Sequence, residues 1–171
     1  MSRATHRPAR ESDLPALVEI YNQIIAEGGH TADLAPFSLE QRRPWFEAHQ
    51  TPPYEVQVVE VDGQAVGYFY LTPWRNGRAA LRRVAEVSYY LARGARGRGL
   101  GRYMLVAAEN YARSAGIRDL LAVLLDINRA SRSLLEKGGF NLAGQLPGIA
   151  DLGENSCGQL IMHKCLEGQT P

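Results

Sequence analysis

The sequence predicts a mixed α/β domain whose central sheet has about seven strands. Strand and helix signals alternate along most of the 171 residues. The apolar run at 120–125 is bounded by aspartates and is typical of a strand buried on both faces in a parallel pairing. At 84–101, a strand rich in β-branched and aromatic residues leads through a glycine-rich loop into a helix. Together these observations place a β-α-β unit at the centre of the chain.

An edge strand and a helix are expected to begin the domain. Residues 3–9 fit a short strand, and the helix follows a cap at Ser12 or Asp13. An apolar stripe at helical spacing runs along this helix until the glycines at 28–29 end it.

A second helix is expected after Ser38, because Gln41 completes a capping box, and Pro44 is expected to interrupt or kink it. The other elements follow in order: strands 56–61 and 64–71 around an Asp62-Gly63 turn, strand 84–91, helix 100–115, strand 120–125, helix 128–137, and strands 140–146 and 159–166. A polar loop at 147–158 is expected to join the last two strands. The predicted order is therefore β-α-α-β-β-β-α-β-α-β-β.

Composition and charge exclude several classes of protein. With 45% hydrophobic and 22% charged residues, the chain is expected to form one globular domain spanning 1–171, with its core at about 5–166. A net charge of +1 provides no global field for nucleic acid or an anionic membrane. No apolar run approaches the roughly 20 residues of a membrane span, and no signal peptide is evident, so a cytoplasmic location is expected. The two cysteines form no CxxC or His/Cys cluster, so no metal site is expected.

The glycine-dense run at 96–101, RGRGLG, lies where a helix begins. Glycine lets backbone N–H groups approach a ligand closely, and the helix N-terminus attracts anions, so the run favours a phosphate or pyrophosphate site. The pattern alone is weakly specific. It fits a dinucleotide fingerprint poorly, because Asp126 is a poor candidate for the acidic partner, and it lacks the Gly-Lys-Ser/Thr ending of a P-loop.

Arg-x-x-Gly-x-Gly after a strand resembles the pyrophosphate motif of the GCN5-related N-acetyltransferases (GNAT). More closely, the chain resembles the phosphinothricin / L-amino-acid N-acetyltransferase branch from about residue 7 to residue 166. The matching stretches are RPARESDLPALVEIYNQII, WF at 45–46, GYFYLTPWR, AEVSYYL followed by RGRGLG, LLAVLLDINRASRSLLEKGGF, and GQLP. The resemblance implies the GNAT fold, in which strand 89–91 splays from its parallel neighbour at 121–125. It also implies acetyl-CoA as co-substrate and a homodimer.

The resemblance further implies which residues hold acetyl-CoA. Backbone N–H groups of 96–102 would bind the pyrophosphate, and the opened strand edges would bond the pantetheine arm. Asn128 would contact the cofactor, although its pattern is also that of a simple helix N-cap. The complete set is Tyr89, Tyr90, Leu91, Arg96, Gly97, Arg98, Gly99, Leu100, Gly101, Arg102, Asn128 and Ser131.

Glu86 is the candidate general base. An amine acceptor is an ammonium ion at neutral pH and must lose a proton before it attacks a thioester, and a strand carboxylate can accept that proton through a water molecule. Strand alternation places Glu86 on one face with Ser88 and Tyr90. The alternative is a structural glutamate that pairs with Arg82 or Arg83.

The family's usual acid, a tyrosine in the helix after the asparagine, is replaced by Leu135. A water molecule, backbone N–H groups, Tyr90 or Tyr103 would then assist departure of the thiolate, although a core role is favoured for both tyrosines. Neither cysteine is placed as a nucleophile.

The acceptor site is expected near Trp74, Arg75 and Asn76, which match a loop of the branch. Arg75 would pair with an acceptor carboxylate, or would be a solvated loop arginine. The loops at 30–37 and 152–156 depart from the branch pattern, which disfavours phosphinothricin or methionine-sulfoximine-type acceptors and favours less negative charge or a different shape. His30 and His49 have no clustered partners in the sequence and are expected at the surface or at helix ends.

These observations predict an acetyl-CoA-dependent N-acetyltransferase that acts on the primary amine of a small molecule, such as an amino acid or an analogue. Two alternatives stay open. One is acetylation of a protein N-terminus or lysine, and the other is a non-catalytic acyl-CoA sensor. No nucleic acid or membrane partner is expected.

Overall fold

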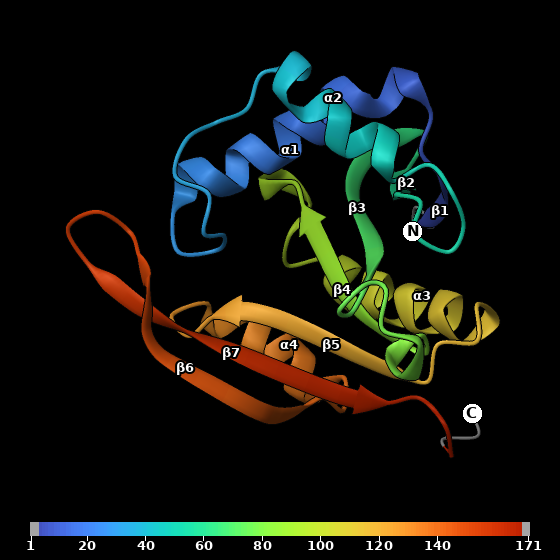
Figure 1. Cartoon of the computed structure of the whole chain (residues 1–171). Coiled ribbons are helices and arrows are strands. Elements are labelled where there is room, and N and C mark those ends of the chain that lie inside the picture. The colour runs from blue at the N-terminus through green and yellow to red at the C-terminus, as the bar shows by residue number, and fades with distance from the viewer. Residues whose placement is uncertain (1–3, 169–171) are drawn as a thin grey trace.

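The computed structural model describes residues 4–168, and within them seven strands form one sheet with helices on both faces (Figure 1). The sheet order is β1-β2-β3-β4-β5-β7-β6. The strands are β1 (Thr5–Pro8), β2 (Gln57–Val61), β3 (Gln64–Pro73), β4 (Val84–Leu91), β5 (Asp119–Leu125), β6 (Asn141–Asp151) and β7 (Ser156–Cys165). The α-helices are α1 (Leu14–Glu27), α2 (Leu39–Ala48), α3 (Leu100–Ser114) and α4 (Arg129–Lys137). The predicted order of elements is confirmed; Arg3 of the predicted first strand lies outside the described residues.

Strands β4 and β5 form the parallel pair, and they pair over only three positions. These are Val84 with Asp119, Ala85 with Leu120, and Glu86 with Leu121. Beyond them β4 continues along β3 and β5 continues along β7, so the two strands diverge (Figure 1). The predicted splayed pair is therefore confirmed, and Glu86 lies at the vertex where the strands separate.

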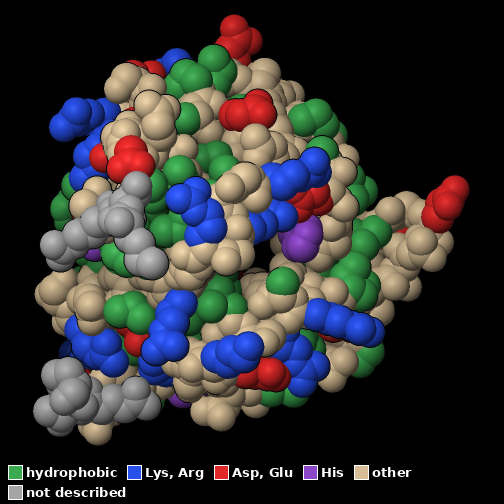
Figure 2. Space-filling model, turned by 180° about the vertical axis from the view of Figure 1, so that it is seen from behind, with side chains coloured by type: hydrophobic (Ala, Val, Ile, Leu, Met, Phe, Trp, Pro, Cys, Tyr) green, Lys and Arg blue, Asp and Glu red, His purple; other side chains and the backbone are tan. Residues whose placement is uncertain are grey.

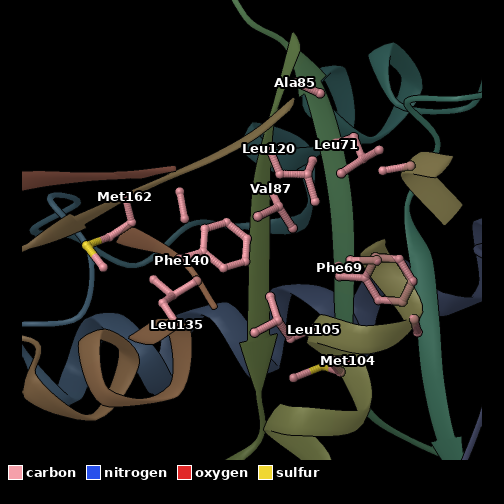
Figure 3. Packing of buried hydrophobic residues seen from close by; sticks show 14 of the residues in the cluster. Phe69, Leu71, Ala85, Val87, Met104, Leu105, Leu120, Leu135, Phe140 and Met162 are labelled. Carbon is pink, nitrogen blue, oxygen red and sulfur yellow. The ribbon is translucent and has the colours of Figure 1, made fainter. Parts of the chain in front are cut away.

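The two faces of the sheet bury different clusters. Alternate residues of β3 belong to opposite clusters, with Phe69 and Leu71 on the α3 and α4 face and Tyr68 and Tyr70 on the α1 and α2 face. Figure 3 shows Phe69 and Leu71 on β3 beside Val87 on β4, with side chains from α3 nearby. The cores on both faces hold the edges of the divergent strands in place.

The turn and capping predictions for the first 63 residues are partly confirmed. The Asp62-Gly63 turn has positive φ at both residues, as the hairpin prediction requires. The Ser38 capping box forms as predicted, but α2 continues through Pro44 instead of ending there, because proline removes only one N–H donor and the flanking turns remain helical. Asp13 precedes α1 without capping it, because its carboxylate instead accepts hydrogen bonds from Arg7 and from the Arg10 N–H.

The predicted loop at 147–158 is largely wrong. Strand β6 continues to Asp151 and β7 begins at Ser156, so the hairpin is longer and its connection shorter than predicted. An irregularity between Leu146 and Ala150 contains Pro147 and Gly148. This bulge accommodates the two strand-breaking residues, and β6 pairs with β7 on both sides of it.

A buried ion pair ties α3 to β7. Lys164 Nζ lies 2.7 Å from both Glu109 Oε2 and the Gly138 carbonyl oxygen. We expect Lys164→Ala to lower the free energy of unfolding by about 3 kcal/mol, because the buried Glu109 charge then keeps only Arg113, at 3.8 Å, as a cationic partner. Urea unfolding measures the loss. Lys137→Ala, at an exposed position of α4, is the control with little change, and an equally small effect at Lys164 would contradict the prediction.

Within residues 4–168, no helix combines the length and apolar character needed to cross a membrane.

Candidate active site

A cavity of about 310 Å³ lies where β4 and β5 diverge. Side chains from both faces of the sheet line it: Val87, Tyr89 and Leu91 on one side, and Ser88 and Tyr90 on the other. The edge of β5, the start of α3, the first turns of α4 and the end of α1 complete the wall. The cavity therefore lies within the sheet layer itself, and its wall includes residues from both faces.

The glycine-rich loop presents a row of unused donors. Gly97 and Gly99 have φ of +74° and +79°, and Gly99 is the N-cap of α3. Among the described residues, none of the backbone N–H groups from Gly97 to Arg102 donates to a carbonyl or a side chain. The Arg96 N–H, which was predicted to belong to this set, instead donates to the Arg93 carbonyl oxygen at 3.3 Å. Because these donors lie at the positive end of a 15-residue helix, the loop is suited to an anion such as a pyrophosphate.

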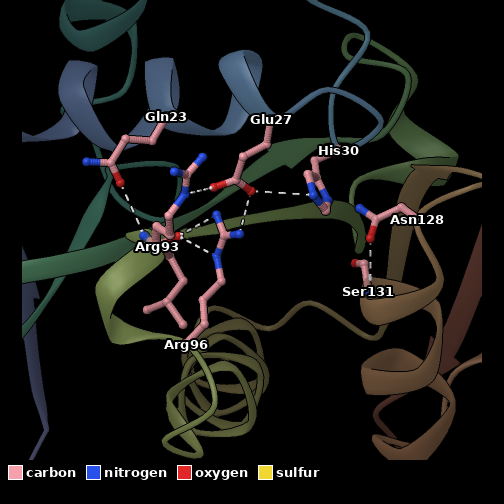
Figure 4. A network of polar contacts seen from close by, with 8 residues as sticks. Gln23, Glu27, His30, Arg93, Arg96, Asn128 and Ser131 are labelled. Atoms are coloured by element: carbon pink, nitrogen blue, oxygen red, sulfur yellow. Dashed lines mark hydrogen bonds and ion pairs between the residues drawn. The ribbon is translucent and has the colours of Figure 1, made fainter.

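Glu27 at the end of α1 fixes this loop (Figure 4). Its carboxylate lies 2.5 Å from Arg96 Nη1 and 2.8 Å from Arg93 Nε. Arg96 also donates to the Leu91 carbonyl oxygen. The hydrogen bond from Arg96, together with Arg93, lowers the pKa of Glu27. His30 Nε2 lies 3.5 Å from the same carboxylate and lines the cavity, so this histidine has a partner that the sequence did not indicate.

Sequence reasoning missed Glu27. The available signal is its position, because the helix dipole disfavours a carboxylate in the last turn and a nearby cation would offset that cost. Which arginine supplies the partner depends on contacts between α1 and the loop, 66 and 69 residues apart.

Two hydroxyl groups meet across the opening. The Tyr89 hydroxyl, from β4, lies 2.6 Å from Ser131 Oγ in the first turn of α4. Asn128 Oδ1 accepts from the Ser131 N–H at 3.1 Å, so the N-cap interpretation of Asn128 is confirmed. Asn128 also lines the cavity, as does Ser131. Burial raises the pKa of Tyr89 to about 12, so its phenol is neutral at physiological pH.

Glu86 occupies the last paired position before the strands diverge. It is half-buried, and it makes no hydrogen bond or ion pair with any residue from 4 to 168. Arg83 bonds Glu167 and the Gly116 carbonyl, and Arg82 bonds the Ala79 carbonyl, so the alternative pairing with Arg82 or Arg83 does not form. Burial raises the pKa of Glu86, which favours a proton acceptor. Glu86 itself is outside the cavity wall, next to Val87 and Ser88, which are part of it.

Eight of the twelve predicted cofactor residues line the cavity, and the other four lie in the adjoining loop and first turn of α3: Arg98, Gly99, Leu100 and Arg102. Leu135 is buried in the wall and supplies no donor. Tyr90 packs edge-on against Tyr21, and Tyr103 contacts His6, so both tyrosines have packing roles.

The structure does not bring the predicted acceptor loop to the cavity. Trp74, Arg75 and Asn76 follow β3 and line a separate hollow, together with Arg78 and Arg82. The loop nevertheless begins two residues beyond Thr72, which is paired with Glu86. On the rear face of the molecule, Lys and Arg side chains gather around a central hollow (Figure 2).

Comparisons with known proteins agree with this geometry. The family model described as an acetyltransferase (GNAT) domain matches residues 3–141. The Bacillus subtilis (strain 168) protein YwnH, whose name assigns it provisionally to the phosphinothricin acetyltransferases, is 39% identical over 86% of this chain and 90% of its own length. The L-methionine sulfoximine/L-methionine sulfone acetyltransferase of Pseudomonas paraeruginosa is 31% identical over 85% of each chain.

Among solved structures, a GNAT superfamily phosphinothricin acetyltransferase from Sinorhizobium meliloti, in complex with acetyl-CoA, is similar with a TM-score of 0.89. It is 28% identical, and the match covers 100% of this chain and 94% of that one. The chain therefore belongs to the GCN5-related N-acetyltransferase family and is an N-acetyltransferase similar to the enzymes named for phosphinothricin and amino-acid derivatives.

Proposed function

We propose that the protein transfers the acetyl group of acetyl-CoA to the primary amine of a small molecule, an amino acid or an analogue of one. The observation that carries this proposal is the opening between β4 and β5. Among residues 4–168, it has unused N–H donors at one end and an unpartnered carboxylate at the other. The solved relative that holds acetyl-CoA supports the choice of co-substrate.

Each end of the opening has its own task. The N–H groups of 97–102 bind the pyrophosphate, and the unpaired edges of β4 and β5 bond the pantetheine arm as an additional strand would. The rest of the predicted cofactor set, from Tyr89 to Ser131, surrounds that arm. The thioester then lies near the vertex, on the side of the opening that Glu86 and Ser88 approach.

Glu86 acts on the acceptor. It takes a proton from the ammonium group through a water molecule, and the freed nitrogen attacks the thioester carbon. The N–C bond forms, the C–S bond breaks, and sulfur leaves with the electron pair. The amine loses two protons in all, one through Glu86 and one after attack. No covalent enzyme intermediate is needed.

The acceptor is assigned to the small amines because relatives named for methionine sulfoximine and amino-acid acylation match most of the chain. Trp74, Arg75 and Asn76 lie next to the Glu86 end of the sheet and are the proposed contacts for the acceptor's non-reacting part. Residues 152–156, LGENS, provide no cation, so an acceptor with less negative charge than phosphinothricin is favoured.

A thiol-release assay tests the function. It uses a panel of amino acids, phosphinothricin, methionine sulfoximine, and peptides with a free N-terminus or a lysine. Turnover on a free amino acid or analogue supports the proposal. Turnover confined to the peptides would replace it with protein acetylation, and acetyl-CoA binding without turnover on any amine would replace it with a non-catalytic sensor.

The proposal also includes a cytoplasmic location and a homodimer, whose interface is assigned to strand β6. Strand β6 lies at the sheet edge and exposes Leu142, Leu146 and Ile149, which are 49%, 41% and 57% accessible. An apolar edge strand of this kind favours pairing with a second copy. We expect the double variant Leu146→Glu/Ile149→Glu to sediment as a monomer while the unmodified protein sediments as a dimer. Val106→Glu, at an exposed apolar position on α3, should stay dimeric; a monomeric unmodified protein would refute the interface.

A further inference from the structure

We propose that the paired hydroxyl groups of Tyr89 and Ser131 donate a hydrogen bond to the sulfur atom that leaves during acetyl transfer. This inference rests on the proposed function and adds to it the group that stabilises the leaving thiolate. Leu135 and its neighbours Leu134 and Met104 line the same cavity and cannot donate.

The position of the pair follows from the two elements that open the sheet. Tyr89 extends from β4 and Ser131 from α4, and their oxygens meet at 2.6 Å on the α3 and α4 face. Both residues line the cavity. Asn128 holds the backbone of Ser131 through the helix cap, and the Tyr89 ring packs against the core on the α3 and α4 face.

The pair also has a hydrogen to spare. Two hydroxyl groups carry two hydrogens, and the bond between them uses one. The other hydrogen is available to an acceptor in the cavity, whichever oxygen carries it. Among residues 4–168, no other contact uses this second hydrogen.

The other polar side chains of the cavity have different roles. His30 and Arg96 are held by Glu27 beside the glycine loop. Ser88 and Tyr90 are on the opposite face of the sheet, the face from which Glu86 acts. Asn128 uses its Oδ1 as the acceptor of the cap, and its amide N–H groups are assigned to the pantetheine arm.

The order of groups along β4 favours a sulfur atom on the Tyr89 side of the reacting carbon. The pyrophosphate loop lies beyond one end of the strand and Glu86 lies at the vertex, with Tyr89 three residues from Glu86, roughly 10 Å along the strand. An arm that runs from the loop toward the vertex passes Tyr89 before it reaches the carbon that the amine attacks. The sulfur atom joins the pantetheine arm to that carbon, so it lies on the side of the carbon from which the arm arrives.

The chemistry favours a hydrogen bond over full proton transfer. A thiol has a pKa of about 8.5, whereas burial raises the pKa of Tyr89 to about 12. The proton therefore stays on oxygen while a preorganised hydroxyl donor stabilises the charge on sulfur. The thiolate takes up its own proton later, from solvent or from the attacked nitrogen.

The bound thiol provides the direct test. Coenzyme A is titrated in complex with the protein, and thiolate absorbance is followed against pH. We expect the thiol pKa in the unmodified complex to lie below that of free coenzyme A, and Tyr89→Phe to raise it by about 1 unit. Desulfo-coenzyme A lacks the thiol, so its dissociation constant should differ less than about 2-fold between Tyr89→Phe and the unmodified protein. An unchanged thiol pKa in Tyr89→Phe, or failure of coenzyme A to bind the unmodified protein, would overturn the inference.

Steady-state kinetics give a second measurement. Tyr89→Phe is expected to lower kcat about 10-fold or more with a nearly constant KM for acetyl-CoA, and Ser131→Ala to do the same. The double variant should be no worse than the more damaged single variant, because the two hydroxyls act as a unit. Tyr111→Phe removes a hydroxyl that bonds Glu55 outside the cavity and is the matched control.

Additive losses in the double variant, or losses confined to KM, would show that the pair only shapes the cavity. The binding titration needs no acceptor, so an inactive unmodified protein would refute the proposed function without preventing this test.

Discussion

Replacing Glu86 with glutamine lowers kcat about 100- to 10,000-fold at neutral pH, because the ammonium acceptor then has no positioned proton acceptor. The dissociation constant for acetyl-CoA is expected to change less than about 3-fold, since Glu86 lies at the vertex and outside the cavity wall. Glutamine has nearly the same shape, so the effect isolates the carboxylate. Thiol release should therefore show the lower kcat, and calorimetry should show that acetyl-CoA still binds.

The pH profile sharpens this prediction. Burial raises the pKa of Glu86, so the active carboxylate forms at a higher pH than for an exposed glutamate. In the unmodified protein, kcat/KM should fall as the pH is lowered through that raised pKa, and this limb should disappear in Glu86→Gln. Glu19→Gln, at an exposed position on α1, is the control that keeps the unmodified profile.

The ionised Glu86 carboxylate is expected to favour activity but to lower the stability of the fold. A carboxyl group whose pKa is raised by folding favours the folded state at low pH, and that contribution is lost as the pH rises through the raised value. Above it, the ionised and unpartnered Glu86 disfavours folding. Glu86→Gln should therefore keep or raise Tm at neutral pH while it removes activity. A lower Tm together with unchanged kcat would identify Glu86 as a structural residue and place the base elsewhere.

Local sequence signals predicted the centre of the molecule well. Strand β4 has the predicted bounds, 84–91, because β-branched and aromatic residues end abruptly at the glycine-rich loop. Asn128 caps α4 and Asp62-Gly63 turns the hairpin, since each of these roles depends only on adjacent residues. The splay followed from family resemblance and not from spacing, because it depends on where pairing between β4 and β5 stops.

The features that the sequence did not predict depend on contacts between residues far apart in the chain. Glu27 and Arg96 are 69 residues apart, and neither residue type reveals its partner. The hairpin of β6 and β7 extends through a segment whose Pro147 and Gly148 locally indicate a loop, because cross-strand pairing outweighs those local preferences. The Tyr89–Ser131 bond likewise spans 42 residues and exists only because α4 packs beside the open edge of β4.

Substituting Gly99 with aspartate weakens acetyl-CoA binding about 100-fold or more. Gly99 is the N-cap of α3, amid the unused N–H groups of 97–102, so an aspartate carboxylate there would lie close to the pyrophosphate. Two like charges about 4 Å apart near a protein surface repel by about 4 kcal/mol, and each 1.4 kcal/mol is tenfold in affinity. Repulsion of this size outweighs the modest favourable contribution of one or two N–H donors.

Gly99→Asn is the matched control, because it separates charge from backbone strain. Gly99 has φ of +79°, and a Cβ atom there would meet no atom within 4 Å outside its two chain neighbours, so the substitution is strained but not blocked. Asparagine and aspartate tolerate this conformation similarly and have nearly the same size. Calorimetric titration should therefore give a much larger loss for aspartate than for asparagine, with a difference that shrinks in high salt. Equal losses would assign the effect to strain, and unchanged affinity in both variants would move the pyrophosphate away from this loop.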